Sequence, residues 1–508
     1  MISKKLLIGL VMIGAILLAG DVHQRFGFCD SSEASPFGSN NPFKSTKGKT
    51  SNYLQDLGVR WISDRFPRRQ IEQMSEHGIV YDFSVIDDKL REYGEETLSN
   101  AWFIINIDSK LQFEDGRRIG DRNNYIPEGP ISFEAYETYL SRLVEYVNTK
   151  VPGWQVKYWS IDNEQSGIYL EAFGEDKEGA KHAAKMYAKL VKKSYKIIKS
   201  QDPDAKIVFG GPGSSTKNRV YRFFYKKALK VLKRKAPGGY FDFFDYHNFN
   251  SFPKYKENAK GKGIDFFRTL LAETGFEGKP IIIKAGATHS GMDTLGGKIA
   301  KNYQSEKQQA EYLLKRFVYH AAEGIRVILW ATIRENQSFG GDEHSFFNFT
   351  GLMYNGLPES GQCSPITQLP CPDPGDGIKK LSYYTFKLLM EKVAGCDWDN
   401  VQTLVDGQDN VYVYGLTQKE TGNPIWVAWW DYFDEEQYVP EDSKTITVDV
   451  GSTSMSVLIT EMIPDAESGT DLYESDYPNF FRTEIKGVMG GSVSLDLKEI
   501  PVFIEISG

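Results

Sequence analysis

The chain has 508 residues, which is too long for one compact core and predicts at least two domains. Its composition, with 41% hydrophobic and 25% charged residues, is ordinary for a soluble globular protein. The formal net charge of −8 argues against a nucleic-acid partner, which would require a basic surface.

The N-terminus carries an apolar segment that follows two lysines. Lys4 and Lys5 precede the sequence LLIGLVMIGAILLAG, residues 6–20. A basic start, an apolar core and small terminal residues are typical of a secretory signal, and the run is shorter than the roughly 20 residues that a membrane span needs. We therefore predict a signal peptide over residues 1–20 and a secreted, periplasmic or extracellular protein. A membrane anchor through residues 6–20 is the alternative.

Short apolar runs alternate with amphipathic helical patterns between about residues 52 and 390. The expected strands are residues 59–62, 102–107, 156–161, 206–209, 241–247, 281–283 and 327–331. This alternation predicts parallel β/α architecture. An eighth strand near residues 35–38 would close the sheet, and no Gly-rich phosphate loop follows any strand. We therefore predict an α/β fold, a (β/α)8 TIM barrel over residues 21–392, in preference to an open doubly wound sheet.

The hydrophobic periodicity changes after about residue 395. Apolar residues then alternate with polar ones at period two, as at residues 446–450, and turn residues separate the runs. This pattern predicts an all-β sandwich over residues 393–508 whose role is to pack against the barrel. We expect Trp426, Trp429 and Trp430 in its core, with carbohydrate binding as the alternative.

The cysteines and histidines show no pattern of metal ligands. Cys363 and Cys371 bracket a Pro-rich insertion over residues 351–377 and are candidates for a disulfide in an oxidising compartment. Cys29 and Cys396 form a second pair or remain free thiols. The cysteine spacing matches no metal site, and the histidines are isolated. We therefore predict neither a metal nor a cofactor.

The segment with the clearest chemical signal is VKYWSIDNEQSG, residues 156–167. A strand rich in β-forming residues ends there in Asn163 and Glu164, and a Gly-containing loop follows. A glutamate at the carboxyl end of a barrel strand lies where catalytic groups collect, beside neighbours that can raise its pKa. Such an acid can protonate a leaving-group oxygen, and the adjacent amide can hold a sugar hydroxyl. The segment therefore points to carbohydrate chemistry.

Segments in order along about residues 35–390 resemble the barrel of clan A glycoside hydrolases. VKYWSIDNEQSG is similar to the fourth-strand motif of that clan, whose Asn-Glu pair carries the general acid/base. The other segments are SPFG, LGVRWISDRFPRRQIE, YDFSVIDDKLREYG, QDPDAKIVFGG, FDFFDYHNF, IIIKAGATHSG, GIRVILWATIREN and KKLSYYTFKLL. The nearest resemblance is to glycoside hydrolase family 39, which contains β-xylosidases and α-L-iduronidases. It implies a TIM barrel, a following β-sandwich, a glycosidase activity and a carbohydrate partner.

The resemblance assigns roles to single residues. It makes Glu164 the general acid/base and Asn163 its substrate-binding neighbour. His247, at the end of the sixth strand, is expected to line the mouth of the barrel. Trp330, at the end of the eighth strand, is expected to form an aromatic floor for a sugar ring, and His289 is expected at the rim. For each residue, a buried and hydrogen-bonded place in the core is the alternative.

Two positions depart from the pattern of the family. Aligning IIIKAGATHSG without gaps puts Ala285 where relatives carry the nucleophilic glutamate. Relatives also place an arginine directly after the second strand, whereas here Ser63 follows it and the nearest arginine is Arg65. Lys284 is a poor substitute nucleophile, because strand alternation points it away from the face that holds Ala285. Loss of the nucleophile together with its supporting cation indicates a changed or abandoned mechanism.

Three mechanisms remain open from the sequence. In the first, Glu335 or Asp245 acts as general base at the wider carboxylate spacing of inverting enzymes, about 6.5–9.5 Å. In the second, the chain is a catalytically inactive sugar-binding protein that keeps the hydrolase fold. In the third, the substrate supplies its own nucleophile. A purely structural secreted scaffold is a further class, but it leaves Glu164 unexplained.

Overall fold

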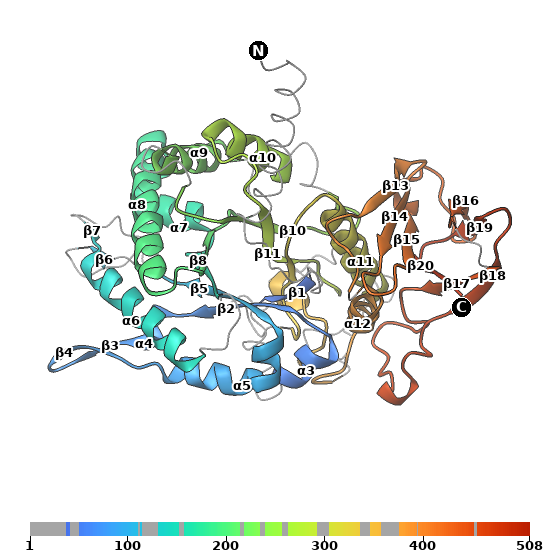
Figure 1. The fold of residues 1–508 in the computed structure, drawn as a ribbon, viewed down its shortest axis with the longest axis horizontal. Helices are drawn as coiled ribbons and strands as arrows, with labels where there is room; N and C mark the ends of the chain where they lie inside the picture. The colour runs from blue at the N-terminus through green and yellow to red at the C-terminus, as the bar shows by residue number, and fades with distance from the viewer. Residues whose placement is uncertain are drawn as a thin grey trace, which may run out of the picture.

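The computed structural model describes two units of the chain, a barrel ringed by helices and a β-domain beside it (Figure 1). The predicted signal segment and Cys29, Cys363 and Cys371 lie outside the described residues. Within them, no helix is long and apolar enough to cross a membrane. The described residues are 37–40, 50–109, 112–113, 131–151, 157–213, 218–233, 239–256, 263–291, 304–335, 346–356, 375–393, 395–451 and 455–507.

Eight parallel strands close into a barrel in the order β1-β12-β11-β10-β9-β8-β5-β2. The strands are β1 (Phe37–Asn40), β2 (Trp61–Phe66), β5 (Trp102–Ile107), β8 (Lys157–Ile161), β9 (Lys206–Phe209), β10 (Phe243–Phe249), β11 (Ile281–Ala287) and β12 (Ile328–Trp330). The predicted (β/α)8 barrel is confirmed, and β1 is the eighth strand expected before residue 50.

The barrel strands are apolar on both faces, which is why they read as continuous hydrophobic runs. Alternate residues such as Trp61, Trp102 and Tyr158 pack against one another inside the barrel. Their neighbours, such as Ile62 and Phe103, pack against the outer helices. Aromatic side chains therefore fill the interior of the barrel near the amino ends of its strands. A ligand site has room only above this layer, at the carboxyl ends of the strands, which we call the mouth.

Helices cover the outside of the barrel (Figure 1). The N-cap side chain of Asp176 accepts a hydrogen bond from the Gly179 amide at 2.7 Å and starts α8. A capping box between Ser305 and Gln308 starts α11. The helices are α3 (Thr50–Asp56), α4 (Arg68–Ile71), α5 (Ser84–Asn100), α6 (Glu134–Lys150), α7 (Gln165–Phe173), α8 (Lys177–Gln201), α9 (Arg219–Lys233), α10 (Gly263–Thr274), α11 (Glu306–Ala322) and α12 (Leu381–Val393).

Two antiparallel pairs and a short helix lie in the connections of the barrel. They are β3 (Glu72–Ser75) with β4 (Gly78–Tyr81), β6 (Gln112–Phe113) with β7 (Ile131–Ser132), and the 3-10 helix η3 (Phe346–Phe349). The first pair lies between β2 and α5, and η3 follows β12 along the chain. These elements are insertions in the connections, and they do not change the topology of the barrel.

The β-domain is a six-stranded antiparallel sheet, in the order β13-β14-β15-β20-β17-β18, with a two-stranded sheet β16-β19. Its strands are β13 (Gln402–Gln408), β14 (Val411–Thr417), β15 (Pro424–Trp430), β16 (Lys444–Asp449), β17 (Ser456–Glu461), β18 (Thr483–Gly487), β19 (Ser492–Leu497) and β20 (Val502–Ile506). Residues of both sheets form one apolar cluster. Trp426, Trp429 and Trp430 are all buried, which leaves no ring face for a sugar.

The β-domain packs against α11 and α12, which lie between it and the barrel (Figure 1). The Trp429 indole N–H donates to the Tyr255 hydroxyl at 2.8 Å, and that hydroxyl donates to Asp431 at 2.8 Å. Lys315 of α11 pairs with the same Asp431 carboxylate at 3.4 Å. Because these polar groups are buried together with a continuous apolar cluster, the β-domain is fixed to the side of the barrel.

Two strands are longer than the sequence predicts. β2 continues through Arg65 to Phe66, and β11 continues through Lys284 to Ala287. The predicted strands ended at residues 62 and 283 because polar or small residues follow there. Those residues belong to the closed sheet instead of lying in loops, and all of them except Arg65 are buried, which changes what Lys284 and Ala285 can do.

Candidate functional site

Glu164 lies three residues after the end of β8 and is the N-cap residue of α7. Asp162 and Glu164 both have left-handed backbone conformations, with φ of 56° and 50°. Such conformations are unfavourable for residues with a side chain and persist only where the surroundings hold them. The turn between β8 and α7 is therefore a built feature that places Glu164 at the mouth.

The carboxylate of Asp162 holds this turn. It accepts hydrogen bonds from the Ser109 amide at 2.7 Å, the Ser109 hydroxyl at 2.6 Å and the Tyr169 hydroxyl at 3.1 Å. Burial and the charge of Asp108 nevertheless raise the pKa of Asp162 to about 6. Asp162 thus ties the turn to the end of β5 and to α7.

Glycines after β9 leave space for the same turn. A Cβ atom on Gly213 would lie 3.2 Å from the carboxyl carbon of Glu164. A Cβ atom on Gly210 would overlap the side-chain amide of Gln165, which donates to the Ile161 carbonyl at 3.1 Å. The sequence FGGPG after β9 is therefore required by close approach to the residues around Glu164.

A chain of hydrogen bonds leads from Glu164 into the barrel. Glu164 Oε1 lies 2.8 Å from His247 Nδ1, and His247 Nε2 lies 3.0 Å from Asp245 Oδ2. Both His247 and Asp245 belong to β10, two residues apart and therefore on the same face of the strand. His247 thus lies directly between two carboxylates.

Lys284 of β11 is the last group in this series of hydrogen bonds. Its ammonium group donates to Asn106 Oδ1 at 2.6 Å and to Ser160 Oγ at 2.8 Å, and it lies 3.4 Å from Asp245 Oδ2. Three acceptors match the three hydrogens of an ammonium group. The Lys284 amide also donates to Asp245 Oδ1 at 3.0 Å, so that Asp245 is bound by both ends of Lys284.

The prediction that Lys284 points away from the face of Ala285 is wrong. Between Asp245 and His247, β10 advances two residues, while β11 advances three, from Ile282 to Ala285. The extra residue is a β-bulge, which interrupts the alternation of side chains. Lys284 lies inside the barrel because it alternates regularly with the inward-facing Ile282, and the bulge brings Ala285 beside His247 on the same inner face.

The charges of these hydrogen-bonded groups determine whether each of them is protonated. Burial would lower the pKa of His247, but the two carboxylates raise it to about 9. Burial would raise the pKa of Asp245, but Lys284 and His247 lower it to about 2. Burial also acts to raise the pKa of Glu164, yet the His247 hydrogen bond and charge outweigh it, and this pKa is lowered. Glu164 is therefore an anion bound to an imidazolium, contrary to the raised pKa expected from its position.

Of the four hydrogen-bonded groups Glu164, His247, Asp245 and Lys284, only Glu164 is open to a ligand. The side chain of Glu164 is 47% exposed, whereas those of His247, Asp245 and Lys284 are 2%, 0% and 1% exposed. The other three groups therefore orient and charge Glu164 without touching a ligand themselves. In this arrangement Glu164 can accept hydrogen bonds from hydroxyl groups, which is how a carboxylate binds a sugar.

Two further predicted residues lie at or near the mouth. Asn163 is half-buried next to Glu164 in the turn. Arg65 is exposed and lies within β2, opposite Asn106 of β5, not in a loop two residues past the strand. Its positive charge adds to the burial that lowers the pKa of Lys284.

Trp330 and His289 are in different surroundings from those expected. The Trp330 ring is buried against Tyr312 and Phe317 of α11, and its N–H donates to the Thr350 carbonyl at 2.9 Å. It faces the outer helices and offers no floor for a sugar. His289 is buried, with its ring 5.2 Å from that of Phe346 in η3. Both side chains are therefore buried in the core, which was the alternative to a role in sugar binding.

Neither suggested substitute base is open to a ligand. Asp245 is enclosed behind His247, with both oxygens engaged. Glu335 is buried and forms an ion pair with Lys380, whose ammonium group also donates to Ser290 Oγ at 2.8 Å. A general base of an inverting enzyme must reach a water molecule on the sugar, and neither carboxylate has such access.

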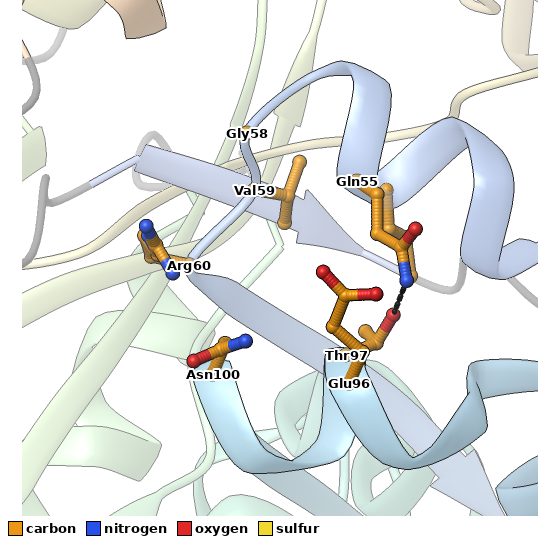
Figure 2. A pocket seen from close by; sticks show the side chains of 8 residues that line it. Gln55, Gly58, Val59, Arg60, Glu96, Thr97 and Asn100 are labelled. Atoms are coloured by element: carbon orange, nitrogen blue, oxygen red, sulfur yellow. Dashed lines mark hydrogen bonds between the residues drawn. The ribbon is translucent and has the colours of Figure 1, made fainter.

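A cavity of about 180 Å³ opens at the opposite end of the barrel. Figure 2 shows Val59 and Arg60, which precede β2, with Thr97 and Asn100 at the end of α5. Gln55 donates to Thr97 across it at 3.5 Å. Because active sites of this fold lie at the carboxyl ends of the strands, we assign this cavity no role in ligand binding. Among the described residues, no group of three His, Cys, Asp or Glu side chains could hold a metal ion.

Solved structures of glycoside hydrolases have the same architecture. The GH39 enzyme from Xanthomonas axonopodis pv. citri superposes with a TM-score of 0.55 at 12% identity, over 94% of this chain and 96% of that one. The chain has a glycoside hydrolase-like fold. A GH30 endoxylanase from Clostridium papyrosolvens C71 gives 0.51 at 12% identity, over 94% and 97% of the chains. A glucosidase from Croceicoccus marinus gives 0.53 at 13%, over 93% and 96%.

The likeness to these glycoside hydrolases extends to the fold alone, since so few residues are identical. No protein-family model and no curated protein sequence matches the chain. The function must therefore be argued from the site itself.

The sequence analysis did not predict that Lys284, Asn106 and Ser160 are parts of the site. A signal was present, because Asn106 and Ser160 are polar residues in otherwise apolar strands, at positions that alternate with the outward-facing ones. Polar side chains on the inner face near the end of a barrel strand are candidates for a buried network. The bulge that puts Lys284 and Ala285 on the same face has no such signal in the sequence.

Proposed function

We propose that this protein binds a carbohydrate at the mouth of the barrel, with Glu164 accepting hydrogen bonds from sugar hydroxyls, and that it does not hydrolyse the glycosidic bond. One observation carries the proposal: the exposed carboxylate of Glu164 is paired with His247, while the second carboxylate, Asp245, is enclosed behind that imidazole. We further propose that residues 1–20 direct the protein out of the cytoplasm.

The carboxylate arrangement argues against both common hydrolytic mechanisms. A retaining glycosidase needs a second carboxylate about 5–5.5 Å from the acid/base, and the position that resembles the nucleophile is Ala285. An inverting glycosidase needs a base that activates water on the far side of the sugar. Asp245 has no exposed surface, and Glu335 is occupied by Lys380.

The charge of Glu164 also favours binding over acid catalysis. A general acid works best with a pKa near the working pH, which for a glutamate requires an upward shift. Here His247 shifts the pKa of Glu164 downward, even though burial opposes the shift. Hydrolysis with Glu164 as general acid/base is the competing function, and it is favoured by the position of Glu164 at the end of β8.

Replacing Glu164 with glutamine tests the proposal. We expect E164Q to weaken oligosaccharide binding at least tenfold, because hydrogen bonds to a charged acceptor are worth about 1.5–3 kcal/mol. The measurement is isothermal titration calorimetry with oligosaccharides that bind the wild-type protein, chosen from a panel. E171Q is the matched control, since Glu171 is exposed on the same α7 helix and takes no part in the site.

The same panel, offered as activated aryl glycosides, separates binding from hydrolysis. We expect no turnover by the wild-type protein. Turnover that E164Q abolishes and E171Q preserves would contradict the proposal and establish a glycosidase. Unchanged sugar affinity in E164Q would place the binding site elsewhere on the protein.

A further inference from the structure

Positive charge is concentrated on two neighbouring helices of the barrel. α8 carries eight lysines and one acidic residue, and α9 carries four lysines and two arginines with no acidic residue. The whole chain has a net charge of −8, so the remaining elements are strongly acidic. Such a separation of charge creates a field that extends beyond single residues and steers oppositely charged partners.

The lysines of α8 lie on one face of the helix. They recur every three or four residues, which is the helical repeat, while the alanines and leucines between them are buried. With 25 residues, α8 is about 38 Å long, so the row of lysines spans one side of the barrel. The row consists of Lys177, Lys181, Lys185, Lys189, Lys192, Lys193, Lys196 and Lys199.

α9 packs side by side with α8 and extends the same surface. Arg219, Lys230 and Lys233 of α9 are exposed. We call the solvent faces of α8 and α9 the basic flank. Carboxylates that pair with the basic flank in the described part of the chain include Glu178 with Lys181 at 3.0 Å, Glu137 of α6 with Lys193, and Glu273 of α10 with Lys226 at 2.6 Å.

We propose that the basic flank binds the surface of a membrane that contains anionic phospholipids. Lysines are strongly hydrated point charges without a fixed geometry, and they suit a diffuse negative surface more than a shaped ligand. None of the exposed large hydrophobic side chains among the described residues lies on α8 or α9. The flank therefore lacks the exposed apolar face of an inserting helix, and its aromatic residues, such as Tyr195 and Tyr221, are only partly exposed.

Two features of the chain agree with a membrane surface as the partner. A membrane anchor through residues 6–20 is the alternative to a cleaved signal peptide, and one such anchor together with a polybasic patch gives stable attachment where either alone is marginal. The basic flank is on the side of the barrel, whereas the mouth opens along its axis. Attachment through the flank would leave the mouth open to a carbohydrate.

Vesicle sedimentation with the full chain tests this proposal. We expect the protein to partition onto vesicles of phosphatidylglycerol and phosphatidylcholine more than onto phosphatidylcholine alone, and the difference to disappear at high salt because of screening. Reversing three exposed charges of α8, in K185E/K189E/K196E, is expected to reduce partition onto the anionic vesicles at least about tenfold.

The matched control is K254E/K419E/K498E, which reverses three exposed lysines away from the basic flank and makes the same change in net charge. We expect it to partition within about twofold of the wild-type protein, and circular dichroism checks that both variants are folded. Equal loss in both variants, or equal partition of the wild-type protein onto neutral vesicles, would overturn the proposal. Binding to polygalacturonate without partition onto anionic vesicles would overturn it in favour of an acidic polysaccharide.

Discussion

Replacing Lys284 with methionine is expected to lower the free energy of unfolding by about 3–5 kcal/mol. Methionine keeps most of the length of the side chain but removes the charge that lies 3.4 Å from Asp245 in a fully buried site. Asp245 would then remain as an uncompensated carboxylate, and Asn106 and Ser160 would lose their shared donor. Chemical denaturation of the wild-type protein and K284M measures the difference.

Two further variants separate the effect of burial from that of charge. Lys226 and Glu273 form an ion pair at 2.6 Å with about half of each side chain exposed, so K226M is expected to lower the free energy of unfolding far less than K284M does. The double variant D245N/K284M removes both buried charges and should recover part of the loss. A K284M protein as stable as K226M would show that Lys284 is not the counter-ion of Asp245.

Replacing Ala285 with glutamate is expected to create glycosidase activity in a protein for which we propose binding without hydrolysis. Ala285 lies beside His247 on the inner face of the barrel, and the sequence analysis predicts a nucleophile at this position in a glycosidase. A carboxylate there would share His247 with Glu164, and repulsion between like charges would raise the pKa of Glu164 toward that of a general acid. The two carboxylates required for retaining hydrolysis would then both be present.

The matched variant A285Q adds a side chain of the same size without charge and should stay inactive. In the A285E background, the additional E164Q replacement is expected to reduce turnover of an activated aryl glycoside by about 10²–10⁴-fold, the usual contribution of a general acid/base. A folded A285E protein without activity on a broad panel would show that Ala285 does not face the glycosidic bond held by Glu164.

Much of the fold could be predicted from the sequence because its patterns are regular. The alternation of apolar runs and amphipathic helices predicts the barrel, and the change to period two predicts the β-domain. Glu164 and His247 could be placed at the ends of two strands, and the structure brings them into hydrogen-bonding contact. Their partner Asp245 was named only as a possible base, because its burial depends on packing that no local pattern encodes.

The errors arose where a shift of one residue changes the face of a strand. Trp330 ends β12, but its phase along the strand turns it outward to α11, while the preceding Leu329 faces the interior. In β11, Lys284 follows Ile282 into the interior by regular alternation, and the bulge then brings Ala285, which regular alternation would turn outward, to the same face. Resemblance to a family places a residue near the end of a strand, whereas the face it occupies follows from the register of its neighbours.

The ionisation of Glu164 is the property on which the binding proposal depends most directly. It can be measured by ¹³C NMR titration of protein labelled at its glutamate carboxyl groups, with the spectrum of E164Q assigning the resonance of Glu164 by difference. We expect a pKa below the ordinary value of 4.5, because the His247 hydrogen bond and charge outweigh the effect of burial. A pKa above 4.5, as a general acid requires, would contradict the proposal and favour hydrolysis.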